Sequence, residues 1–124
     1  MTAAAGPDHG FLAVTNVRPE GDLVAHGFLL RDGATVSLAS GERQVERDPR
    51  EGWVTRITVT ARDMTGRELN ATGVPVSRII INRHTFIDIS SLIRWELDGA
   101  LAWGEDQDMW PVHRWARVRR DRAR

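Results

Sequence analysis

The chain has no cysteine and no lysine. The first absence excludes classes of chemistry, and the second bears on the origin of the sequence. Without cysteine there is neither a disulfide framework nor thiolate chemistry. All 17 basic residues are arginines, and they balance 17 acidic residues to a formal net charge of +0. A neutral chain has no overall field that favours nucleic acid or a membrane surface. The absence of lysine indicates a GC-rich genome rather than a particular function.

Other common signals are also missing. No apolar run approaches the roughly 20 residues that a membrane-spanning helix needs. The first residues lack the charged and apolar regions of a signal peptide, so we expect a cytoplasmic protein. There is no glycine-rich phosphate loop and no Gly-x-Ser-x-Gly context for a serine nucleophile. The four histidines lack the spacing of a zinc site, so we expect neither a metal nor a cofactor.

At 124 residues, the chain fits one domain with a sizeable apolar core. Residues 1–8 are small and polar, which predicts a flexible leader. We expect a single β-barrel domain over residues 9–118 and an arginine-rich tail over 119–124. The tail lacks interleaved aromatic residues, so we interpret it as a solvated end and expect no nucleic-acid partner.

Alternation of apolar and polar residues is the main structural signal. It is clearest over residues 53–62 and returns over 85–97. A period of two is typical of half-buried antiparallel strands. The alternation predicts one core that contains Trp53, Ile57, Val59, Ile89, Ile93 and Trp95.

Turn signals divide the chain into short strands. Arg-Asp-Gly at 31–33 and Asp-Gly at 98–99 are typical of hairpin turns. We expect separate strands over 68–73 and 76–82, with Pro75 leading into the second. About eight strands in up-and-down order predict an all-β fold, an antiparallel lipocalin/calycin-like barrel. A two-sheet β-sandwich is the alternative.

Residues 100–115 combine large and ionisable groups more densely than any earlier stretch. Neighbouring carboxylates in apolar surroundings raise one another's pKa, so Asp106, Glu105 or Asp108 could serve as a general acid. His26, on the apolar face of its strand, is the candidate partner. Alternatively, the carboxylates pair with nearby arginines such as Arg114, and His26 is a satisfied core or rim histidine.

Aromatic residues are the candidate ligand-binding groups. Trp53, Trp95 and Trp103 share strand phase with inward aliphatic residues. With Trp110 and Phe28, they could line a cavity and stack on a flat apolar ligand. Alternatively, they fill the barrel, because the interior of an eight-stranded barrel is scarcely wider than its side chains.

Several of these motifs together resemble a known group. Gly-x-x-x-Arg-Asp-Gly at 27–33, Trp53, Asp-Gly at 98–99 and Trp-Gly-Glu-Asp-Gln-Asp-Met-Trp-Pro at 103–111 are similar to the C-terminal barrel of calycin-type actinobacterial proteins. These are in turn distantly similar to the hydroxyneurosporene synthase (carotenoid hydratase-like) superfamily, whose members pair two barrels. The resemblance covers most of residues 9–117, and the terminal motif is its specific part.

The resemblance implies a calycin fold and an isoprenoid- or polyketide-like ligand, but no catalytic residue. Because this chain has room for one barrel, it also implies a homodimer that restores the missing partner surface. The leading hypothesis is binding of a small hydrophobic molecule inside the barrel or at its mouth. The alternatives are a cofactor-independent isomerase, cyclase or hydratase with a carboxylate acid, and a structural or assembly module. A buried carboxylate without an arginine partner would favour the enzyme, a solid core the assembly module, and an open apolar cavity the binder.

Overall fold

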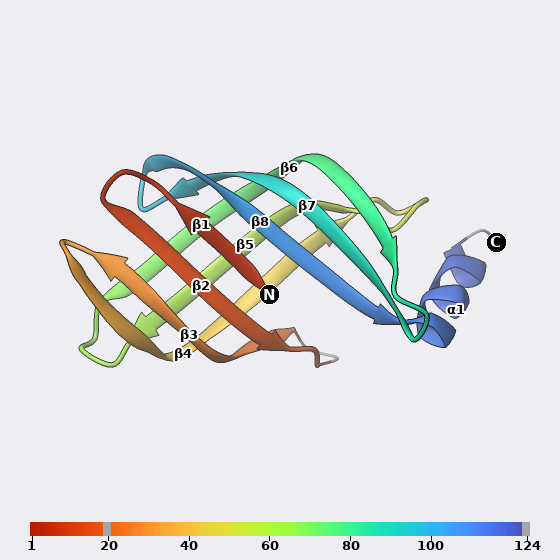
Figure 1. Ribbon diagram of the computed structural model, residues 1–124, viewed down its shortest axis with the longest axis horizontal. Coiled ribbons are helices and arrows are strands. Elements are labelled where there is room, and N and C mark those ends of the chain that lie inside the picture. The colour runs from red at the N-terminus through yellow and green to blue at the C-terminus, as the bar shows by residue number, and fades with distance from the viewer. Residues whose placement is uncertain (19–20, 123–124) are drawn as a thin grey trace.

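The computed structural model describes residues 1–18 and 21–122, with side chains to residue 117. Nearly all of it is β-structure, followed by one helix (Figure 1). The elements are β1 (Thr2–Ala5), β2 (His9–Asn16), β3 (Asp22–Arg31), β4 (Ala34–Arg47), β5 (Val54–Asp63), β6 (Glu68–Asn82), β7 (Phe86–Leu97), β8 (Ala100–Pro111) and α1 (Val112–Arg122).

The strands form a closed antiparallel barrel. Each strand pairs with its neighbours in sequence, and β1 pairs with β8 to complete the wall. The predicted all-β barrel of eight strands is confirmed, and the two-sheet sandwich is not the fold. At both predicted hairpins the Asp-Gly residues have positive φ: 53° and 74° at Asp32 and Gly33, 48° and 85° at Asp98 and Gly99. Positive φ at both central residues is the type I′ geometry, whose twist suits adjoining strands.

The count of eight is right although two of the predicted elements are wrong. The leader predicted over residues 1–8 contains β1, which pairs with both β2 and β8. Its small residues lie so close to β8 that a Cβ on Gly104 would collide with the backbone of Ala3. The strands predicted over 68–73 and 76–82 are one strand, β6, which continues through Pro75 with a register shift between Pro75 and Ser77.

The end of the chain also differs from the prediction. The barrel ends at Pro111, and α1 takes up the last residues assigned to the barrel and the first of the predicted tail. Residues 123–124 of that tail lie outside the described residues. Within residues 1–18 and 21–122, no helix has the length and apolar character needed to cross a bilayer.

The predicted core is largely confirmed. Ile57, Val59, Ile93 and Trp95 belong to one buried cluster. Trp53 and Ile89 are not members of it. Around Trp53 the alternation fails because β5 bulges: Arg47 pairs with Val54 but Glu46 pairs with Arg56, so Thr55 is an extra residue and Val54 takes the inward place.

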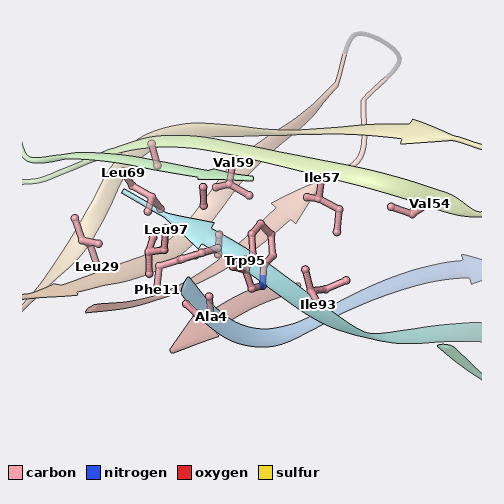
Figure 2. Packing of buried hydrophobic residues seen from close by; sticks show 14 residues of the cluster. Ala4, Phe11, Leu29, Val54, Ile57, Val59, Leu69, Ile93, Trp95 and Leu97 are labelled. Carbon is pink, nitrogen blue, oxygen red and sulfur yellow. The ribbon is translucent and has the colours of Figure 1, made fainter. Parts of the chain in front are cut away.

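Trp95 lies near the centre of this cluster (Figure 2). Its ring meets Phe11 edge to face, with centroids 5.3 Å apart and planes at 81°. On β6, Gly73 leaves room for it, because a Cβ there would come within 2.7 Å of the Trp95 ring and 2.5 Å of Ile93. Side chains from facing walls thus fill the middle of the barrel.

Candidate functional site

The strands separate at the end of the barrel where α1 lies (Figure 1). Pairing of β3 with β4 ends at Asp22 and Arg43, but β4 continues to Arg47. The last paired residues of β1 and β8 are Thr2 and Asp106, and Met1 still exchanges hydrogen bonds with Gln107, but β8 continues to Pro111. One side of the wall is therefore open between β4 and β8.

A second separation lies between β5 and β6. Their pairing ends at Ile57 and Gly73, although β6 runs on to Asn82. Pro75 follows two residues after the last pair. Because proline has no N–H, it cannot donate to a ladder on the β5 side. The barrel thus divides into two ribbons, residues 44–56 of β4 and β5 and residues 74–92 and 105–111 of β6, β7 and β8. We refer to this region as the split end.

A buried ion-pair network joins β3 and β4 to β8 at the point where the ribbons begin. Arg43 of β4 donates through Nε and Nη2 to the two carboxylate oxygens of Asp106 on β8, at 3.0 and 2.7 Å. Its Nη1 donates to Asp22 of β3 at 2.7 Å. Arg43 and Asp106 are only 4% and 2% exposed. A bidentate guanidinium–carboxylate pair has the geometry that can offset the loss of water around both charges.

A second ion pair lies nearer the end of the ribbons. Arg47 donates through Nη1 to Asp108 at 2.8 Å and to the carbonyl of Gly52 at 3.2 Å. Burial alone would raise the pKa of Asp108, but the hydrogen bond and charge of Arg47 and the nearby Trp110 indole outweigh it and lower that pKa. Asp108 is therefore ionised at neutral pH and is a poor general acid.

Three tryptophans complete the split end. Trp115 of α1 has its ring centroid 5.8 Å from that of Trp53, before β5, and 6.3 Å from that of Trp110 on β8. The planes are tilted by 43° and 46°. Arg78 lies 4.6 Å from the Trp53 centroid, and Arg47 lies 5.4 Å from the Trp110 centroid. Trp115 thus joins the two ribbons, each through a ring that also carries an arginine. We refer to these three rings as the aromatic bridge.

A polar hollow of about 410 Å³ adjoins the ion pairs where β3 begins. This volume is in the range of small-molecule sites. The hollow is lined by Arg18, Gly21, Asp22, Arg43, Gln44, Val45 and Arg47.

The structure separates the predicted acid–base candidates. Asp106 and Asp108 face the barrel interior, where arginines pair with them, whereas Glu105 is on the opposite face of β8. His26 is exposed on the outer face of β3. The structure therefore does not bring His26 and Asp106 together as an acid–base pair. Alternation predicted the wrong face for His26 because both faces of β3 carry apolar residues. Leu29, at 0% exposure, is on the face that points inward, and His26 is on the other face.

The predicted ligand-binding aromatics are divided in the same way. Trp95 fills the core, while Trp103 and Phe28 are on the outer wall, 46% and 40% exposed. The inward assignment of Trp103 is therefore wrong. On β8 the inward phase belongs to Ala102, Asp106 and Trp110, so it contains charged groups. Of the five predicted aromatics, only Trp53 and Trp110 are near one another, through Trp115.

Sequence reasoning missed most of the partners at the split end: Asp22, Arg43, Arg47, Arg78 and Trp115. The sequence did contain one signal for the ion pairs. Arg43 and Arg47 are four residues apart and therefore on the same face of β4, and Asp106 and Asp108 are two residues apart and therefore on the same face of β8. Among the described residues, no three His, Cys, Asp or Glu side chains are grouped to hold a metal ion. Comparisons with protein-family models, curated proteins and solved structures gave no match. Function is therefore inferred from the geometry of the split end.

Proposed function

We propose that the protein binds a small, flat and largely apolar molecule between Trp53 and Trp110, in the place that the Trp115 indole occupies. The observation that carries this proposal is the aromatic bridge itself. Trp115 comes from a terminal helix that contacts the ends of β7 and β8, whereas its two neighbours belong to the barrel. No described residue of α1 belongs to the buried core cluster, so displacement of the helix need not disturb the core.

Both flanking rings are held in advance. Arg78 lies over Trp53 and donates to the carbonyl of Val54 at 3.3 Å, which fixes it beside the ring. Arg47 lies by Trp110 and is fixed by Asp108. Cation–π contacts of this kind orient an aromatic surface. Rings already ordered lose less entropy when a ligand stacks on them.

The proposed ligand class is isoprenoid- or polyketide-like, as the resemblance implies. Such molecules combine an apolar body with one or a few oxygen atoms. The aromatic bridge suits the body, and the polar hollow, whose lining residue Arg47 also lies beside Trp110, suits an oxygen-bearing end. The proposed site is thus at the mouth of the barrel, because core side chains fill the middle.

The first test removes the Trp115 indole, which occupies the proposed ligand position. In Trp115→Ala, we expect an anionic aromatic probe, anilinonaphthalene sulfonate, to bind about 5- to 160-fold more tightly, because Trp115 forms two aromatic pairs that contribute about 0.5–1.5 kcal/mol each. Trp53→Ala should lose this binding. Probe fluorescence in a titration measures both effects.

Trp103→Ala is the matched control, since Trp103 is on the outer wall. It should bind the probe as the unmodified protein does. The proposal would fail if Trp115→Ala left the affinity unchanged, or if Trp103→Ala weakened binding as much as Trp53→Ala.

The carboxylate-acid enzyme is less well supported. A general acid must be protonated before it donates, yet Asp106 and Asp108 both pair with arginines, and the pKa of Asp108 is lowered. Their candidate partner His26 is on the other face of the wall. This arrangement favours binding over proton transfer.

A further inference from the structure

The end of β6 has an unpaired edge. Residues 74–82 pair with β7, as far as Asn82 and Ile87. On their other side, pairing with β5 has already ended at Gly73. Half of the backbone N–H and C=O groups of this segment therefore point away from any strand of the barrel.

The same segment is exposed on both faces. Ile79 is 61% exposed and its neighbour Ile80 is 53% exposed, while Val76 is 50% exposed. Successive residues of a strand point to opposite faces, so Ile79 and Ile80 show that neither face is covered. Long apolar edges of this kind pair readily with another chain.

Several other edges are open at the split end, and the two beside the ion pairs carry the usual protection. The edge of β4 beyond Arg43 contains Glu46 and Arg47, and the edge of β8 beyond Asp106 contains Asp108 and Pro111. Charges and proline prevent strand pairing at an edge. In β6 the one charged residue beyond Pro75 is Arg78, and it is turned onto Trp53 and the carbonyl of Val54. The β6 edge is thus unprotected.

We propose that a second copy of this chain pairs along the edge, β6 to β6 and antiparallel, about a two-fold axis at Ile79. In this register Arg78 is opposite Ile80 of the second copy, so no like charges face each other across the pair. Both unpaired edges are satisfied by the same contact, so assembly stops at a dimer. The interface is independent of the proposed ligand, since it needs neither the aromatic bridge nor the polar hollow.

Light scattering on the full chain at micromolar concentration tests the proposal. We expect twice the 13.9 kDa chain mass. Ile79→Lys should halve that mass, because a lysine on the edge prevents strand pairing. Its β-sheet circular dichroism should be unchanged, since Ile79 is largely exposed.

Leu101→Lys is the matched control, because Leu101 is equally exposed, at 60%, but lies on the outer wall of β8. It should remain dimeric. Amide hydrogen exchange of residues 77–81 should slow as protein concentration rises, since pairing protects the backbone. A monomeric unmodified protein, a dimer that survives Ile79→Lys, or exchange independent of concentration would overturn the proposal.

Discussion

Arg43 shows how a single side chain can connect parts of a barrel whose strands have separated. It is almost completely buried, and all three of its nitrogens donate to carboxylates, two to Asp106 and one to Asp22. Burial would lower the pKa of Arg43, but the charge and hydrogen bonds of Asp106 raise it above its ordinary value. The three charges are stable in the interior only as a set.

Removing the cation should therefore be costly. We expect Arg43→Ala to lower the free energy of unfolding by about 3–5 kcal/mol, because the buried Asp106 and the partly buried Asp22 lose their partner. Urea denaturation measures the change. Arg62→Ala provides the comparison: the Arg62–Glu68 pair is exposed on both sides, at 60% and 63%, and should contribute about 0–1 kcal/mol. Equal losses in the two variants would contradict this account of Arg43.

Asp106→Asn separates a stabilising role from a catalytic one. The amide keeps the shape but loses the charge, so we expect a loss of about 1–3 kcal/mol, the cost of a charge-assisted hydrogen bond. Melting curves with and without an apolar probe measure it. Glu105→Gln, on the other face of β8, should melt almost as the unmodified protein. An unchanged or raised melting temperature in Asp106→Asn would instead indicate a functional acid.

At the scale of elements, the turn between β5 and β6 depends on one carboxylate. Asp63 accepts hydrogen bonds from the backbone N–H groups of Thr65 and Arg67, at 2.9 and 3.0 Å, and from Arg67 Nε at 2.6 Å. Arg67 in turn donates to the carbonyl of Arg31 at 2.9 Å. Burial would raise the pKa of Asp63, but these hydrogen bonds lower it well below its usual range.

A pH dependence follows for this turn and for the Arg47–Asp108 pair. The pKa values of Asp63 and Asp108 are lower in the folded protein, so their contribution is complete above the unfolded value of about 3.9. Below it, the unfolded chain binds protons first, and stability falls. We expect urea midpoints to decrease between pH 5 and pH 2, and less steeply in Asp63→Asn. A midpoint independent of pH over that interval would contradict the prediction.

The strands could be predicted from the sequence wherever one face was buried and the other was not. That condition holds in β5 and β7, and Asp-Gly identified two hairpins. It fails in β1, whose alanines give no contrast between faces, and in β6, where Pro75 indicates a break. The proline is tolerated because β6 has lost its β5 neighbour there.

At the scale of the whole molecule, the candidate site could be predicted only in part. The acidic and aromatic character of residues 100–115 was visible, and Asp106, Asp108 and Trp110 do lie at the split end. Their partners come from β4 and α1, which depend on where the shorter strands stop and which phase of each strand faces inward. Neither property follows from alternation when inward positions are charged, as Arg43 and Asp106 are.

Seven of the eight strand pairings join segments that are adjacent in the sequence, and only β1 with β8 joins the two ends of the barrel. The seven need only short loops to close, so the wall can assemble hairpin by hairpin at little entropic cost. The eighth closes almost the whole chain and rests on four residues of β1. We therefore expect this contact to form last and to open first, so that the folding rate of the barrel depends on the β1–β8 pairing.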